Sequence, residues 1–197
     1  MTTTWDDADK KNQQTYRHLL ESMSRPGRVV KIHLPEEGNG YAAALAIGRC
    51  LLDQEVSMGA AGSNAIKRIQ DMLVEKTRVR VDGYETADYL FVDDQGIDKG
   101  IAVAKRGRID APETAATLIC FLSDNPACET DRLRVRLTGP GIGSPLGIMP
   151  EMPGIGLATF KALAEANADY PLGVDAFFVR ATGDLMALPR STRISVR

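Results

Sequence analysis

The stretch Thr117-Leu-Ile-Cys-Phe-Leu122 decides the fold class. It has the length of a strand and is apolar at every position after Thr117, which is typical of a strand buried on both faces. Ser123-Asp-Asn-Pro126 follows it and ends the run. Helix-like and strand-like segments alternate on both sides of this stretch. The sequence therefore predicts an α/β fold, a three-layer sandwich with a mixed central sheet.

Helical spacing of apolar residues predicts the first helix. Tyr16, Leu19, Leu20 and Met23 form one apolar stripe, and Pro26 ends the helix. Three more helices are expected at residues 41–54, from Ser63 as N-cap through Leu73, and at 158–167. Strands are expected at residues 28–34, 56–60, 79–81, 89–92, 117–122, 174–180 and 185–188. Residues 35–40 are expected to form a turn, and 99–110 a loop or irregular segment.

Length and composition indicate one α/β domain over residues 1–197, with residues 1–9 disordered or loosely attached. The chain is 44% apolar and 25% charged, with a net charge of -2, so it has no overall attraction for nucleic acid. The N-terminus lacks the features of a secretion signal, and no apolar run is long enough to span a membrane. Three cysteines match no zinc motif. A cytoplasmic protein without nucleic-acid or membrane partners is expected.

The stretch Arg132-Leu-Arg-Val-Arg-Leu-Thr-Gly-Pro-Gly-Ile142 alternates arginine with aliphatic residues. This pattern predicts a strand with three guanidinium groups on one face and a core-facing aliphatic side. The glycines that follow allow a tight turn and a close backbone approach. Such a strand end suits an anion site, but an ordinary strand with a solvated face has the same pattern, and the pattern alone favours the ordinary strand.

Common catalytic arrangements are absent from the sequence. Only two histidines are present, without metal-binding spacing, so we expect no metal site. His18 is expected to be a surface or packed side chain. The glycine loop at residues 139–143 lacks the Lys-Ser/Thr of a phosphate-binding loop and does not open into a helix. No G-x-S-x-G serine is present. We expect no catalytic residue and no cofactor.

Two further residues near the C-terminus are of interest. Arg190 follows a strand in Leu188-Pro-Arg-Ser-Thr192, where a guanidinium and hydroxyl groups can hold a phosphate or phosphonate; a surface arginine in a turn is the alternative. Asp175 follows Pro171-Leu-Gly173 and is expected to order that turn through its backbone amides rather than to act in catalysis.

Four segments in this order resemble one family, the PhnH subunit of the bacterial carbon–phosphorus lyase system. They are Tyr16-Arg-His-Leu-Leu-Glu-Ser-Met-Ser-Arg-Pro-Gly27, Arg136-Leu-Thr-Gly-Pro-Gly-Ile142, Pro171-Leu-Gly-Val-Asp175 and Ala187-Leu-Pro-Arg-Ser-Thr192. Ala111-Pro-Glu-Thr-Ala-Ala-Thr-Leu118 is a weaker fifth. The resemblance extends from about residue 10 to the C-terminus, and it is loose between Leu34 and Lys105.

The resemblance implies a role in phosphonate catabolism. It implies a non-catalytic or co-catalytic subunit of a core complex with PhnG, PhnI and PhnJ. That complex forms ribose 1-phosphonate 5-triphosphate from ATP and an alkylphosphonate. The resemblance also implies a homodimer when isolated, and a fold like the large domain of pyridoxal-phosphate-dependent transferases that has lost the cofactor. The alternatives are a stand-alone transferase acting on a phosphorylated small molecule and a plain homodimeric scaffold.

The motifs of the resemblance also define the candidate site. We expect its residues to bind an anionic group or a partner surface, with Arg136 and Arg190 as the main cations; the alternative is that these motifs only fix turns and strand ends. The candidate residues are Arg17, Arg136, Thr138, Gly139, Gly141, Asp175, Arg190 and Thr192.

Overall fold

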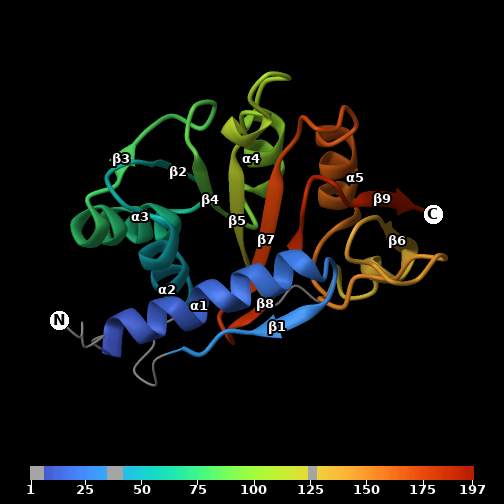
Figure 1. Ribbon diagram of the computed structural model, residues 1–197, viewed down its shortest axis with the longest axis horizontal. Coiled ribbons are helices and arrows are strands. Elements are labelled where there is room, and N and C mark those ends of the chain that lie inside the picture. The colour runs from blue at the N-terminus through green and yellow to red at the C-terminus, as the bar shows by residue number, and fades with distance from the viewer. Residues whose placement is uncertain (1–6, 35–41, 124–127) are drawn as a thin grey trace.

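The computed structural model describes residues 7–34, 42–123 and 128–197. Its centre is a mixed seven-stranded sheet with the order β1-β8-β7-β5-β4-β2-β3 (Figure 1). The strands are β1 (Val29–Lys31), β2 (Ser57–Ala61), β3 (Arg80–Val81), β4 (Tyr89–Asp93), β5 (Thr117–Leu122), β7 (Asp175–Arg180) and β8 (Asp184–Leu188).

The direction of the strands divides the sheet into two parts. One part consists of five strands that run parallel to their neighbours, β7, β5, β4, β2 and β3. The other part contains β8 and β1, and β8 is antiparallel to both β7 and β1. The apolar strand β5 lies between β4 and β7, as its composition predicts. Leu118 and Cys120 pack into one core and Ile119 into the other, so the strand is buried on both faces.

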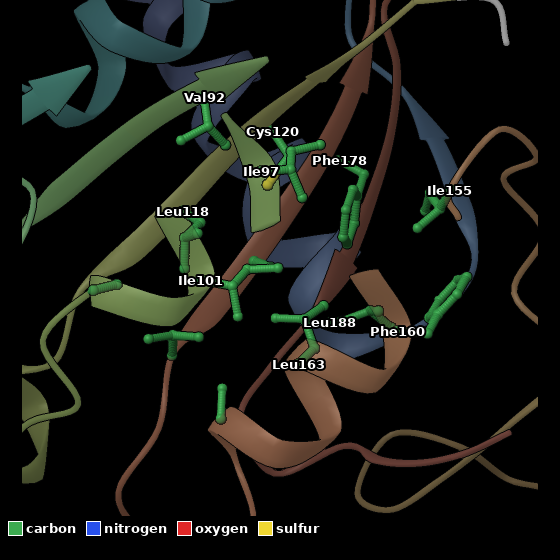
Figure 2. Close-up of a cluster of buried hydrophobic side chains, with 14 of the residues drawn as sticks. Val92, Ile97, Ile101, Leu118, Cys120, Ile155, Phe160, Leu163, Phe178 and Leu188 are labelled. Carbon is green, nitrogen blue, oxygen red and sulfur yellow. The ribbon is translucent and has the colours of Figure 1, made fainter. Parts of the chain in front are cut away.

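Helices cover both faces of this sheet (Figure 1). The first core contains side chains of α1 (Asp7–Ser24), α2 (Ala42–Leu51) and α3 (Asn64–Thr77). The second contains those of α4 (Ile97–Val103) and α5 (Leu157–Ala166). Figure 2 shows this second core, in which Phe160 and Leu163 of α5 and Ile101 of α4 approach Phe178 of β7. The predicted α/β class and mixed sheet are confirmed.

Two strands outside the main sheet form a second, small sheet. They are β6 (Val135–Thr138) and β9 (Arg193–Val196), which pair antiparallel. The prediction of an arginine strand starting at residue 132 is wrong in part, because Asp131–Arg134 form a short 3-10 helix, η3. The alternating pattern continues before Val135, but the strand pairing of β6 with β9 starts only at Val135. Arg136 is therefore the one arginine of the three that lies within a strand.

Three other expectations differ from the structure. The irregular segment expected at residues 99–110 is wrong in part, because residues 99–103 belong to α4, in which Ile97 and Ile101 are buried one turn apart. Strand β9 was not predicted, although Ile194 and Val196 alternate with polar residues.

In α1 the buried residues are Thr15, Leu19 and Ser22, whereas Tyr16 and Leu20 are about half exposed. The buried face of the helix is therefore rotated from the predicted stripe, and on this face the Thr15 hydroxyl donates to the Lys11 carbonyl. This local hydrogen bond lets a polar residue face the core.

Other sequence-based expectations concern the chain ends and turns. The predicted turn at residues 35–40 and the expectation for residues 1–6 lie outside the described residues, as does most of the break after β5. Residues 7–9 belong to α1. Ser63 is confirmed as the N-cap of α3, where its Oγ accepts a hydrogen bond from the Ala65 amide.

Candidate functional site

A cavity of about 730 Å³ brings several predicted residues together. Its walls are residues 138–140 at the end of β6, the C-terminal end of α5 with the residues beyond it, and residues 190–194, which lead from β8 into β9. Since β8 is antiparallel to β7, with Ala176 opposite Leu188, Arg190 reaches the start of β7. The cavity therefore lies near the amino ends of the parallel strands, away from the carboxyl ends where α/β folds usually bind ligands.

Arg190 lines this cavity, but most of its donors are already used. Its Nε and Nη2 donate to the Asp175 carboxylate at 3.1 Å and 2.5 Å, and its backbone amide donates to the same group at 2.8 Å. Its Nη1 donates to the Pro112 carbonyl at 2.6 Å. Both side chains of the pair are largely buried, at 15% and 21% exposure. This arrangement ties β7, β8 and the segment before β5 together.

Asp175 thus has a structural role, but with a partner other than the predicted one. It accepts hydrogen bonds from Arg190 rather than from the Pro171-Leu-Gly173 turn. The turn is instead held by Asn167, whose amide donates to the Val174 carbonyl and accepts from the Val174 amide. Asn167 also lines the cavity, so the same side chain orders the turn and forms part of the wall.

Gly139 and Thr192 belong to two segments of the cavity wall that pack closely, since a Cβ at Gly139 would meet the backbone of Ser191 and Thr192. Gly139 has φ 134°, and a Cβ there would lie 2.8 Å from the Ser191 carbonyl, so only glycine fits. Thr192 is 3% exposed, and its hydroxyl is buried without a hydrogen-bond partner in the described structure. A buried hydroxyl without a partner is costly, and such a group points to strain or to an absent ligand.

Arg193 is a cavity residue that the sequence analysis missed. It is exposed, and within the described part of the chain its side chain makes no hydrogen bond or ion pair. A guanidinium in this state is available to an anion, unlike that of Arg190. The alternation Arg193-Ile-Ser-Val-Arg197 is the signal that could have placed it, because it predicts a strand end beside the Pro-Arg-Ser-Thr motif.

The remaining predicted residues lie outside the cavity. Arg136 donates to the Gly147 carbonyl at 3.4 Å, at the edge of β6 that does not pair with β9. Gly141 contacts the end of α1, where a Cβ would lie 2.4 Å from the Ser24 carbonyl. Arg17 is exposed on α1. The cavity thus gathers Thr138, Gly139, Arg190 and Thr192, whereas Arg136, Gly141 and Arg17 are placed elsewhere.

The carboxyl end of the sheet offers a second possible anion site, at the N-terminus of α3. That position is occupied by the chain itself. Asp93 accepts hydrogen bonds from the Ser63 amide at 3.0 Å and the Ser63 hydroxyl at 2.5 Å. A carboxylate at a helix N-terminus takes the place that a phosphate would otherwise hold. An external anion there would meet a negative charge.

The cysteines of the chain provide no activated nucleophile. Burial raises the pKa of the Cys50 thiol to about 11, and it also raises the pKa of Cys120 and Cys128. All three cysteines are therefore thiols at neutral pH, which are poor nucleophiles. In the described ranges, no three His, Cys, Asp or Glu side chains gather closely enough to hold a metal ion.

Comparison with known proteins identifies the family. The model of the family described as bacterial phosphonate metabolism protein (PhnH) matches residues 3–195. This chain belongs to the PhnH family. The resemblance carried by the sequence motifs is thereby confirmed, and the match includes every cavity residue as well as the Asp175–Arg190 pair.

A curated protein of similar length also matches. HtxG of Stutzerimonas stutzeri, provisionally described as a C-P lyase subunit protein, is 27% identical over 190 residues. The alignment covers 95% of this chain and 87% of HtxG. The PhnH family match runs from α1 into β9, so it includes the small sheet as well as the main one. No helix among the described residues is both long and apolar enough to cross a membrane.

Proposed function

We propose that this PhnH-family chain is a non-catalytic or co-catalytic subunit of a carbon–phosphorus lyase core complex. In this role it assembles with PhnG, PhnI and PhnJ and supports the formation of ribose 1-phosphonate 5-triphosphate from ATP and an alkylphosphonate. The observation that carries the proposal is the family match over residues 3–195, supported by the alignment with HtxG, described as a C-P lyase subunit.

The chemistry of the cavity supports a role without catalysis by this chain alone. The guanidinium of Arg190 is held by Asp175 and a backbone carbonyl, so it stabilises the fold. The cysteine thiols are protonated at neutral pH because burial raises their pKa. A transferase needs a nucleophile or a base positioned next to its substrate. The polar side chains that line the cavity carry hydroxyl, amide and guanidinium groups, and this favours binding over chemistry.

The first experiment is a tagged pull-down from phosphate-starved cells supplied with methylphosphonate, followed by mass spectrometry. Recovery of PhnG, PhnI and PhnJ in constant proportion supports the subunit role. Turnover of ATP and methylphosphonate is then measured for the isolated chain and for the assembly. Turnover by the isolated chain would indicate a stand-alone transferase, whereas recovery of the chain alone would indicate a homodimeric scaffold. Either result overturns the proposal.

The cavity itself is proposed as a site for an anionic group or for an acidic side chain of a partner. Arg193 supplies an available charge, and Ser191 and Thr192 supply hydroxyl groups. Titration with pyrophosphate and with methylphosphonate is the direct test. We expect Arg193→Ala to weaken binding about tenfold. Arg68→Ala is the matched control, because Arg68 is an exposed arginine on α3, at the other end of the molecule (Figure 1).

Further parts of the proposal concern the oligomeric state, the location and the fold relationship of the protein. We propose that the isolated chain is a homodimer located in the cytoplasm, with a fold related to the large domain of pyridoxal-phosphate-dependent transferases. Light scattering after size-exclusion chromatography measures the mass of the isolated chain. A monomer at every concentration tested would refute the dimer.

A further inference from the structure

One face of the small β6–β9 sheet collects arginine side chains. Residues directly opposite each other in an antiparallel pair share a face. Arg136 is opposite Ser195 and Thr138 is opposite Arg193. The Arg197 amide donates to the Arg134 carbonyl, which continues the same register to the pair Arg134 and Arg197. We call the surface formed by Arg134, Arg136, Arg193 and Arg197 the arginine face.

None of these guanidinium groups makes an ion pair with an Asp or Glu side chain of the described residues. Arg134 donates to the Arg197 carbonyl at 3.1 Å and Arg136 to the Gly147 carbonyl at 3.4 Å. The side chains of Arg193 and Arg197 make no ion pair with any described residue. The protein as a whole has 26 acidic and 24 basic residues. Its net charge is therefore slightly negative, whereas this surface is positive. Its charge remains available to a partner.

Large apolar side chains are exposed beside the arginines. Gly147 lies directly against the face, because a Cβ there would be 2.9 Å from Arg136 Cδ and 2.8 Å from Thr138 Cγ2. Its neighbour Leu146 is 83% exposed, and Leu133, adjacent to Arg134, is 54% exposed. Arginine is enriched in protein–protein interfaces, and the exposed leucines add apolar area that a partner can bury.

We propose that the arginine face docks onto an acidic surface of another protein subunit, with Leu133 and Leu146 packing at its edge. This inference rests on the proposed role as a subunit of a complex. We infer a protein partner rather than a nucleic acid, because the exposed leucines add affinity for an apolar surface. Leucines contribute little against a phosphate backbone, where arginine contacts alone supply the binding.

A second copy of the chain is a poor occupant of this surface. In a two-fold symmetric dimer centred on the face, the same patch meets itself. The arginines of one copy would then oppose those of the other. Like charges placed together reduce the free energy of binding by roughly several kcal/mol. The partner must instead present carboxylates.

The test measures binding of the purified chain to an immobilised assembly of PhnG, PhnI and PhnJ at about 0.05 M and about 0.5 M salt. The main variant is Arg134→Glu with Arg136→Glu, which changes no residue lining the cavity. The charge-neutral variant is Arg134→Gln with Arg136→Gln. The matched control is Lys67→Glu with Arg68→Glu, two exposed residues of α3 at the other end of the molecule (Figure 1).

We expect the native chain to bind more weakly at high salt and the double glutamate variant to bind at least about tenfold more weakly than the native chain. The glutamine variant should be intermediate, and the control should bind as the native chain does. Thermal unfolding checks each variant. If the main variant fails to fold, Ser195→Glu with Arg197→Glu replaces it, because both side chains are exposed on the same face and make no side-chain hydrogen bond within the described structure.

Other outcomes overturn the inference in distinguishable ways. Equal binding of the native and glutamate variants removes the face from the interface and leaves the subunit role intact. Failure of the native chain to bind the assembly overturns the subunit role and the inference with it. Loss of self-association in the glutamate variant assigns the face to a second copy. Tight binding of an oligonucleotide that the same substitutions abolish assigns it to nucleic acid.

Discussion

Asp175, the first residue of β7, holds both the backbone amide and the guanidinium of Arg190, which follows β8. The Asp175 carboxylate thus closes the turn that follows β8. It also fixes the Arg190 side chain, which donates to the Pro112 carbonyl. The pair is largely buried, so removal of one member leaves the other without its counter-charge.

Arg190→Ala is expected to lower the free energy of unfolding by about 3–5 kcal/mol, because a buried carboxylate loses its partner. Arg190→Lys should recover only part of this loss, since an ammonium cannot reproduce the two-pronged contact. Urea unfolding measures both. A loss below about 1 kcal/mol for Arg190→Ala would show that the pair contributes no more than a surface ion pair.

Thr192→Val is expected to raise the stability of the protein while it weakens anion binding in the cavity. The Thr192 hydroxyl is buried without a partner in the described structure, so replacing it by a methyl group removes an unsatisfied polar group. We expect the free energy of unfolding to rise by about 1 kcal/mol. If the cavity binds an anion, the same variant should weaken pyrophosphate binding. A destabilised variant would indicate that the hydroxyl is satisfied in solution.

Gly141→Ala tests the contact between the glycine loop and α1. Gly141 has φ 80°, and an added Cβ would lie 2.4 Å from the Ser24 carbonyl. A loss of about 2 kcal/mol or more is expected from the backbone conformation and the clash together. Gly143→Ala is the matched control, because its Cβ would meet no atom within 4 Å. Equal stability of the two variants would contradict the contact.

Asp88 is expected to give the stability of the protein a pH dependence. Burial opposes its ionisation, but hydrogen bonds from Lys105 and Ser57 outweigh burial and hold the pKa of Asp88 below its usual value. Its folded-state pKa is thus lower than its unfolded-state pKa. The stabilisation is therefore present above about pH 4 and is lost as the pH falls through the folded-state pKa.

Asp88→Asn should accordingly lower the free energy of unfolding near neutral pH by about 1 kcal/mol. It should also flatten the loss of stability between about pH 5 and pH 3. Chemical denaturation across this range measures both effects. Asp110→Asn is the control, since the Asp110 side chain is 69% exposed in its pair with Arg108 and should contribute little. Identical pH profiles for native and Asp88→Asn proteins would be inconsistent with this role.

Local sequence patterns determined most of the elements. The apolar run of β5, the N-cap Ser63 and the alternation of Val135 and Leu137 each act through neighbouring residues, so they can be read from the chain directly. The motifs also determined the family, since the PhnH match covers the same segments. Short elements such as α4 escaped prediction because two isoleucines four residues apart form only a weak pattern.

The tertiary structure alone decided which of the candidate residues meet. Arg132, Arg134 and Arg136 suggested one basic strand, but pairing with β9 ends at Arg134 and adds Arg193 and Arg197 to the same face. Likewise, Arg190 suggested an anion ligand until Asp175, fifteen positions earlier, occupied most of its donors. A side chain's partners depend on strand order and register, which arise from contacts between segments distant in the sequence.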